Sequence, residues 1–243
     1  MVKITYLHHS GFAVELDRVV LLFDVISEVP EEVLGTGKPM IFVVTHGHHD
    51  HYDPSIFRLR ELGVPIRYII SDDIELPRAD DITMIKPDER LVVRLSSKNE
   101  LIFRTFGSTD RGISLMVNAE DSVFFYSGDL NWWAWDTEKR PHIDPHAEER
   151  DYKHEISKLK RSLREPIDFA FVPVDPRLDA GELKAALWFI RELHPQYLIA
   201  MHFWDDFDII NRLNEAAKGS GTKIPVFTHR DEVVLDLPDA PES

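Results

Sequence analysis

The sequence predicts an α/β protein of the α+β type, with two mixed β-sheets packed together and helices outside them. Two observations favour this fold class. The first half of the chain is a series of strand-like segments, and the second half alternates strands with amphipathic helices. The sequence contains no internal repeat, low-complexity tract or linker. Its 243 residues are ample for a sizeable core, so we expect a single domain over residues 1–243.

Strand-like segments fill most of the first half. The segment Val2–Leu7 has the period-two alternation of a half-buried strand. Further strands are expected at 12–16, 19–23, 40–44, 67–70, 82–85, 91–95 and 101–106. The segments 113–117 and 123–126 flank a short polar turn at 118–121, and this pattern predicts a hairpin.

Helices are predicted from caps and from apolar spacing. The pair Asp53-Pro54 predicts a helix start, because Asp can cap the free amides and Pro at the first position sacrifices no hydrogen bond. Gly63 predicts the end of that helix. A second helix is expected from apolar residues on one face, at 152, 156, 159 and 163. Then follow a strand at 167–174, a helix around 183–190, a strand at 197–201, a helix at 207–217, and short strands near Val226 and at 233–237.

The composition is that of an ordinary globular protein, with 43% hydrophobic and 29% charged residues. No segment approaches the roughly 18 to 20 apolar residues that a membrane span needs. The start of the chain lacks a basic segment followed by an apolar one, so we expect no signal peptide and a cytoplasmic protein. The sequence makes no prediction of oligomeric state.

The chain is strongly acidic. Its formal net charge is −15, from 28 basic and 43 acidic residues. Such a field opposes nonspecific binding to nucleic acid or to an anionic membrane. We therefore expect a small-molecule substrate, and the charge disfavours nucleic acid or a membrane as a partner.

Four histidines and one carboxylate lie together between His46 and His51. This segment follows a buried strand and precedes a helix cap, so it is expected at the carboxyl edge of a sheet, where ligand sites gather. So many imidazoles in one loop are hard to explain as core, because each buried imidazole needs partners. The chain has no cysteine, so a metal would bind nitrogen and oxygen, which suits zinc, manganese or iron. We expect one or two divalent ions, with zinc as the first choice.

The order of these residues resembles a known signature. His46-x-His48-x-Asp50-His51 is similar to the HxHxDH motif of the metallo-β-lactamase superfamily, and HSGFAVEL, LLFD, Ser127-Gly128-Asp129 and Met201-His202 follow the family pattern. The resemblance implies a four-layer αββα sandwich with a metal site at one edge. The segments STDRG, SGDLNWW, VPVDPR and MHFW resemble an uncharacterised branch similar to the ascorbate-6-phosphate lactonase group.

The resemblance also implies a set of metal ligands. His46 and His48 would bind a first metal, Asp50, His51 and His202 a second, and Asp129 both. The chain departs from the family at the third ligand of the first metal, where relatives usually have a histidine.

Two residues of this chain could stand in for that histidine. Ser108 aligns with it but is a weak ligand, and Asp110 is the better one chemically. If Asp110 binds, the site holds two metals and is more hospitable to manganese or iron. If neither residue binds, the protein holds one metal at the second site.

Other residues are expected near the site. His9 aligns with a family histidine in the first strand turn, and Asp24 ends a strand at the same edge, so either could hydrogen-bond a ligating imidazole. Trp132, one of three tryptophans after Asp129, could line a pocket or belong to the core. Asp175 and Arg177 end another strand, where relatives have substrate-facing loops. Arg177 could clamp a substrate carboxylate or phosphate, or form an ion pair within the protein.

The resemblance implies hydrolysis by metal-activated water. A bound cation can lower the pKa of water from roughly 15.7 to about 7. The attacked group would be a small ester, lactone or phosphoester, with Asp50 and His51 as the catalytic pair and Asp50 orienting the water. The alternatives are a nuclease or phosphodiesterase, redox chemistry at a di-iron site, and a degenerate metal-binding protein without activity.

Overall fold

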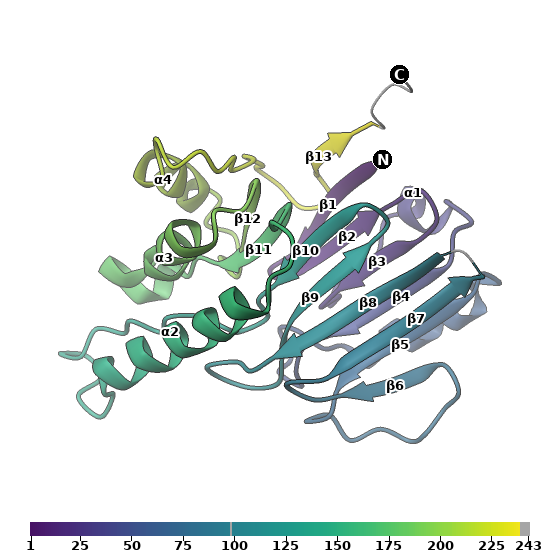
Figure 1. Ribbon diagram of the computed structural model, residues 1–243, viewed down its shortest axis with the longest axis horizontal. Coiled ribbons are helices and arrows are strands. Elements are labelled where there is room, and N and C mark those ends of the chain that lie inside the picture. Colours follow the sequence, from purple (N-terminus) through teal and green to yellow (C-terminus); the bar gives the residue numbers. More distant parts are fainter. Residues whose placement is uncertain (98, 239–243) are drawn as a thin grey trace. The chain divides into compact units, whose positions relative to one another are not determined.

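The computed structural model describes residues 1–97 and 99–238, which fall into two compact units. Unit 1 comprises Met1–Lys86 and the segment that begins at Phe227, and unit 2 comprises Pro87–Val226. Each unit contains one β-sheet with its own helices (Figure 1). Both sheets combine antiparallel and parallel strands, which confirms the predicted α+β class with two mixed sheets. The single-domain organisation stays a prediction.

The sheet of unit 1 has seven strands in the order β13-β1-β2-β3-β4-β5-β6. Strands β13, β1, β2 and β3 pair antiparallel, and β3 to β6 pair parallel. The sequences of β3 and β4, VLLF and MIFVV, are continuous buried apolar runs, as is typical of parallel strands. The bounds are β1 Val2–His8, β2 Gly11–Glu15, β3 Val20–Phe23, β4 Met40–Val44, β5 Ile66–Ser71, β6 Ile82–Ile85 and β13 Val233–Leu237.

Two short helices belong to unit 1. The predicted helix after Asp53 is confirmed as the 3-10 helix η1, Pro54–Leu62, where the Asp53 carboxylate accepts the amide of Ser55 at 2.8 Å. It ends at Gly63, whose φ of 77° is left-handed. The helix α1, Glu31–Leu34, has four residues, which is too short for apolar spacing to predict.

The sheet of unit 2 has six strands in the order β12-β11-β10-β9-β8-β7. Strands β7 to β10 pair antiparallel, and β10 to β12 pair parallel. The predicted hairpin is confirmed as β9 and β10, in which Ala119 pairs with Ser122. The bounds are β7 Arg90–Ser96, β8 Asn99–Phe106, β9 Ser114–Ala119, β10 Ser122–Tyr126, β11 Phe169–Pro173 and β12 Tyr197–Met201.

Helices alternate with the parallel strands of unit 2, as predicted. They are α2 Pro145–Ser162, η2 Pro176–Gly181, α3 Lys184–Leu193 and α4 Asp208–Ala216. Helix α2 begins earlier than its apolar residues indicate, because Asp144 caps it and Pro145 takes the first position. The prediction of a strand near Val226 is wrong. Pro225 has no amide hydrogen for a ladder there, and the nearest pairing is an isolated bridge between Tyr197 and Lys223.

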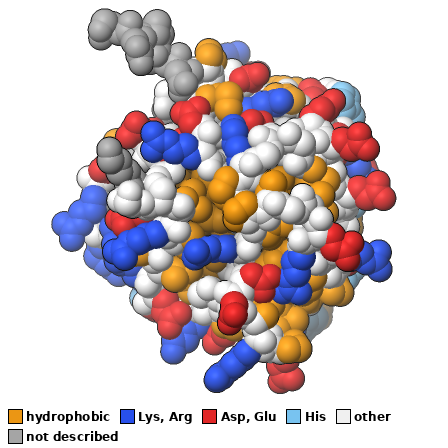
Figure 2. Space-filling view, turned by 90° about the vertical axis from the view of Figure 1, so that its right-hand side faces the viewer, with side chains coloured by type: hydrophobic (Ala, Val, Ile, Leu, Met, Phe, Trp, Pro, Cys, Tyr) orange, Lys and Arg blue, Asp and Glu red, His pale blue; other side chains and the backbone are white. Residues whose placement is uncertain are grey.

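The surface carries both signs of charge. On the face drawn in Figure 2, Lys and Arg side chains stand among Asp and Glu, with hydrophobic side chains showing between them. Within the described parts of the chain, no helix is both long and apolar enough to cross a membrane.

Candidate metal centre

The candidate site residues share one kind of position in both units. In unit 1, Asp24 follows β3 and the histidine loop follows β4, and these two strands are parallel neighbours. In unit 2, Asp129, Asp175 and His202 follow β10, β11 and β12, which are also parallel neighbours. Because parallel strands end at the same edge, each sheet collects its site residues at one edge.

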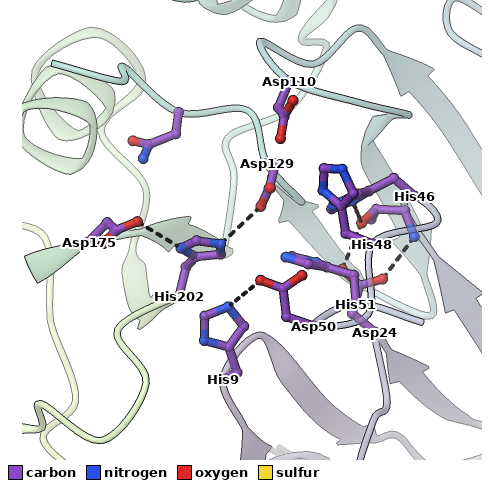
Figure 3. Close-up of polar contacts among 12 residues, drawn as sticks. His9, Asp24, His46, His48, Asp50, His51, Asp110, Asp129, Asp175 and His202 are labelled. Carbon is purple, nitrogen blue, oxygen red and sulfur yellow. Dashed lines mark hydrogen bonds and ion pairs between the residues drawn. The ribbon is translucent and has the colours of Figure 1, made fainter. Parts of the chain in front are cut away.

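Asp24 organises the histidine loop of unit 1. Its Oδ1 accepts the amide of Thr45 at 2.8 Å, and its Oδ2 accepts the Thr45 hydroxyl at 2.7 Å. The same Oδ2 lies 2.7 Å from Nδ1 of His51, and the side chains of both residues are fully buried (Figure 3). Asp24 has a left-handed φ of 41°, which Asp tolerates better than most residues. Asp24 thus hydrogen-bonds the imidazole of His51, one of the candidate ligands.

This network selects the ligand nitrogen of two histidines. An ionised Asp24 only accepts, so His51 carries its proton on Nδ1 and presents the Nε2 lone pair. The single hydroxyl proton of Thr45 goes to Asp24, so its oxygen accepts from Nδ1 of His46, 3.1 Å away. His46 therefore presents Nε2 as well. That Nε2 lies 3.0 Å from Nδ1 of His48, so two ring nitrogens face one point, as two ligands of one ion would.

His9 and Asp50 meet beside His51. His9 Nε2 lies 3.5 Å from Asp50 Oδ2, and ligand atoms of His9, Asp50 and His51 lie within 4.8 Å of one another. Burial raises the pKa of Asp50, but the neighbouring His9 and His51 outweigh burial and hold this pKa well below its usual range. Asp50 is therefore a carboxylate at neutral pH, ready to meet a cation. His49, in contrast, has a 93% exposed side chain, and its Nδ1 lies 4.0 Å from Asp50 Oδ1.

Asp129 and His202 are adjacent in unit 2. His202 Nε2 lies 3.3 Å from Asp129 Oδ1, and both side chains are buried (Figure 3). Thr109 positions the backbone after Asp129: its hydroxyl donates to the carbonyl of Asn131 at 2.6 Å and accepts the Asn131 amide at 2.9 Å. Nδ1 of His202 faces a second carboxylate, Asp175 Oδ2, at 3.2 Å.

Arg177 forms the ion pair within the protein that was one of its two predicted roles. Its Nε lies 2.9 Å from Asp175 Oδ1 and its second guanidinium nitrogen lies 2.5 Å from Oδ2. Burial raises the pKa of Asp175, but His202 and Arg177 outweigh burial and bring this pKa down to about 2. Asp175 is thus a buried, ionised acceptor.

The segment with the missing histidine is open to solvent. The Asp110 amide donates to Ser108 Oγ at 3.2 Å, and the Asp110 side chain is exposed. Among the residues that the structure describes, Asp110 is not one of those whose ligand atoms cluster within 4.8 Å. Metal binding by Asp110 or Ser108 stays a prediction.

The tryptophans after Asp129 divide between two environments. Trp132 packs on Tyr152 of α2 and Trp188 of α3, with ring centroids 6.3 and 5.9 Å away. Trp133 is the ring next to the candidate ligands, 5.7 Å from His202, and it stacks on Trp135 at 5.9 Å. The sequence indicated Trp132 as a residue near the site, whereas the tryptophan beside His202 is its neighbour Trp133.

Sequence reasoning missed three hydroxyl residues that hold the site. They are Thr45, which links Asp24 to His46, Thr109, which fixes the loop after Asp129, and Tyr6, whose hydroxyl accepts the His9 amide at 2.8 Å. The available signal was position, because Thr45 directly precedes the histidine loop and Thr109 lies in the STDRG segment.

The residues present fit a divalent metal. Imidazole nitrogens and carboxylate oxygens are the donors that zinc, manganese and iron accept. In unit 1, the network around Asp24 directs Nε2 of two histidines as ligand atoms and Asp50 is ionised beside them. A metal-binding cluster of histidine and aspartate is therefore a property of this chain.

Comparisons with known proteins agree with this geometry. No known family profile matches the chain. Over 194 residues, 70% of this chain and 83% of the relative, it is 27% identical to a UPF0173 metal-dependent hydrolase of Cereibacter sphaeroides. Its structure is similar to that of Igni18, a metallo hydrolase of Ignicoccus hospitalis, with a TM-score of 0.63, 16% identity, and 98% of this chain and 99% of that one covered.

A second solved structure shows the same fold. YhfI of Bacillus subtilis, a metallo-β-lactamase fold protein, has a TM-score of 0.61 and 15% identity, with 97% of this chain and 100% of that one covered. The two structural likenesses and the sequence relative confirm the resemblance read from the HxHxDH motif. The chain therefore has the metallo-β-lactamase fold.

Proposed function

We propose that this metallo-hydrolase uses metal-activated water to cleave a small ester, lactone or phosphoester. The ligands would be His46, His48, Asp50, His51, Asp129 and His202. One observation carries the proposal: buried Asp24 fixes the ring protons of His46 and His51 so that each presents Nε2 as its ligand atom. A structural core has no need of imidazoles with their lone pairs fixed in this way.

The protein's own groups supply the proton handling. A divalent cation, when bound, supplies Lewis acidity and brings the pKa of water from roughly 15.7 to about 7. Asp50 is ionised, because His9 and His51 hold its pKa down, so it can orient a water molecule and accept a hydrogen bond from it. His51 cannot act as a base through Nδ1, since that nitrogen is engaged by Asp24. Its catalytic role is to hold the metal.

We propose zinc as the resident metal, from the donor set of nitrogen and carboxylate oxygen. If Asp110 contributes a further oxygen, the first site becomes harder, which favours manganese or iron and a pair of ions. If it does not, the second site is the one that holds metal. The count of ions per chain decides between these forms.

The substrate that we propose is small. The net charge of −15 and the mixed charges on the face in Figure 2 weigh against a long polyanion. We also propose the branch similar to the ascorbate-6-phosphate lactonase group, on the resemblance of the segments STDRG and SGDLNWW. We further propose that both units form a single domain over residues 1–243 and that the protein works in the cytoplasm.

A reconstitution experiment tests the proposal. The protein is stripped with a chelator, reloaded with zinc, manganese or iron(II), and assayed on p-nitrophenyl acetate, a chromogenic lactone and bis(p-nitrophenyl) phosphate. We expect metal-dependent turnover of at least one of them, lost in His51→Ala and retained in His49→Ala, whose side chain is exposed. Failure of every reloaded form on all three substrates would overturn the proposed reaction, and preferred cleavage of RNA over all three would overturn the small substrate.

A further inference from the structure

The imidazole of His202 lies between two carboxylates of unit 2. Asp129 Oδ1 is 3.3 Å from its Nε2, and Asp175 Oδ2 is 3.2 Å from its Nδ1. Asp175 is fully buried. The two carboxylates are therefore on opposite ring nitrogens, and only one of these nitrogens can be the atom that a metal binds.

The register of the sheet places Asp175 beside His202. Strands β11 and β12 are parallel, and Pro173 pairs with Met201 at their carboxyl ends. His202 is the next residue after Met201, and Asp175 lies two residues beyond Pro173. The backbone also holds Asp175 as the cap of η2, where its Oδ1 accepts the Arg177 amide at 2.9 Å.

Arg177 binds both oxygens of the Asp175 carboxylate. The Nε atom lies 2.9 Å from Oδ1 and 3.0 Å from Oδ2, and the second guanidinium nitrogen lies 2.5 Å from Oδ2. Such two-point contacts fix the plane of a carboxylate as well as its charge. The orientation of the Asp175 carboxylate toward His202 is thus set by a guanidinium that lysine could not replace.

Unit 1 contains the same pairing on another imidazole. Asp24 follows a parallel strand, is fully buried and lies 2.7 Å from Nδ1 of His51. In unit 1 the hydroxyl and amide of Thr45 fix the carboxylate, whereas in unit 2 Arg177 fixes it. Two unrelated supports for one arrangement indicate that the arrangement itself, a carboxylate on Nδ1, is what the protein requires.

We propose that Asp175 is a positioning residue that keeps the proton of His202 on Nδ1, so that Nε2 is its ligand atom, and that Arg177 locks Asp175 rather than binding substrate. The inference rests on the proposed metal site and deepens it. Partners of this kind typically contribute about 10- to 100-fold in metal affinity or activity. Arg177 would then affect turnover through Asp175 and His202, and it would not act as a clamp for a substrate anion.

Two measurements on the full chain test this role. The first records nitrogen-15 spectra of the histidine rings in metal-free protein, with His202 assigned by its absence in His202→Ala. The second measures zinc affinity by competition with a chromophoric chelator. The variants are Asp175→Asn and Arg177→Lys. Their matched controls are Asp179→Asn, which changes an exposed carboxylate on the same helix, and Arg212→Lys, which changes an arginine that binds Glu182 by two contacts.

We expect His202 to show its proton on Nδ1 in the wild type and to lose that preference in Asp175→Asn. Zinc affinity should fall about 10- to 100-fold in Asp175→Asn and less in Arg177→Lys, with both controls unchanged. If bis(p-nitrophenyl) phosphate is cleaved, Arg177→Lys should lower kcat and leave KM unchanged. A raised KM at constant kcat would show that Arg177 binds the substrate anion and would overturn its role in orienting Asp175.

The outcomes separate this inference from the proposed function. If the wild type binds zinc and Asp175→Asn binds it equally well with His202 unchanged, the inference fails and the proposed function stands. If the wild type binds no metal, the proposed function fails, and the inference fails with it. Arg177→Lys keeps Asp175 and its charge. A change in the position of the His202 ring proton in that variant would therefore report the effect of Arg177 on the orientation of Asp175, and not misfolding.

Discussion

The two units place their site residues by the same rule but encode them differently. In each sheet, antiparallel strands give way to parallel strands, and the candidate ligands follow the parallel ones. Unit 1 concentrates its ligands in one loop after β4, organised by Asp24. Unit 2 spreads its residues over three strand ends, one residue at each: Asp129, Asp175 and His202. Candidate ligands can thus come from one dense motif or from single residues that the topology brings to one sheet edge.

The largest expected effect is in the dense loop. His51→Ala removes the imidazole that Asp24 directs, and we expect it to abolish turnover and to remove at least one metal equivalent. Metal analysis after dialysis and the chromogenic assay measure this. His49→Ala is the control from the same loop. Turnover retained in His51→Ala would contradict the mechanism.

We expect Asp24→Asn to lower zinc affinity more than Asp175→Asn does. The reason is that Asp24 sets the ring protons of two histidines and Asp175 sets one. We expect a zinc affinity loss near the upper end of about 10- to 100-fold, and some loss of folding stability from disturbing a buried pair. Chelator competition and urea unfolding provide the two readouts. Equal losses in the two variants would show that the two units use their carboxylates alike.

Asp110→Ala tests whether unit 2 supplies a further ligand. If Asp110 replaces the missing histidine, the metal-to-protein ratio falls from near two toward one. An unchanged ratio near two would remove Asp110 from the ligand set. Asp121→Ala, at the turn between β9 and β10, is a control for loss of an exposed carboxylate in the same unit.

Thr109→Val should have a moderate effect on unit 2. The substitution removes the hydroxyl that bonds the carbonyl and the amide of Asn131. We expect a cost of about 1–3 kcal/mol in the free energy of unfolding, and weaker zinc binding through Asp129. Thermal or urea unfolding checks the first effect. A neutral variant would show that the loop after Asp129 does not need Thr109.

The smallest expected effect is on the pH dependence of stability and comes from Tyr68 in unit 1. Unit 2 contains a similar buried tyrosine, Tyr152. Tyr68 donates to the carbonyl of Ile56 at 3.0 Å, and Tyr152 donates to the carbonyl of Ala185 at 2.9 Å. Burial raises the pKa of Tyr68 from 10.0 to about 12. Its contribution to stability is therefore complete below pH 10 and is lost as the pH rises toward 12. Urea unfolding should show a shallower decline over that range in Tyr68→Phe than in the wild type, and parallel declines would contradict this.

The same contrast explains what the sequence could predict. The loop of unit 1 is recognisable because its ligands are neighbours in the chain, and β12 was predicted with its true bounds because a short apolar run ends at His202. The partnership of Asp175 with His202 could not be predicted, since it depends on the register of β11 against β12. The role of Thr45 could not be predicted either, because it depends on which groups its hydroxyl contacts in the fold. A hydroxyl becomes informative only when its donor and acceptor partners are both known.

Local chemistry also limits prediction of the elements. Caps at Asp53 and Gly63 indicated η1 correctly, because capping acts within a few residues. Helix α1 has four residues and was beyond any periodic signal. Near Val226 the apolar residues suggested a strand, but the missing amide hydrogen of Pro225 weighs against pairing there.

One measurement tests the central claim, that His51 and His202 each act as a metal ligand. The metal-to-protein ratio is determined for the wild type, His51→Ala and His202→Ala after identical loading with zinc and dialysis. We predict that the wild type retains at least one zinc per chain and that both variants lose the same equivalent. A His202→Ala protein that keeps the full wild-type ratio while His51→Ala loses its metal would contradict the account, because His202 would then not be a ligand.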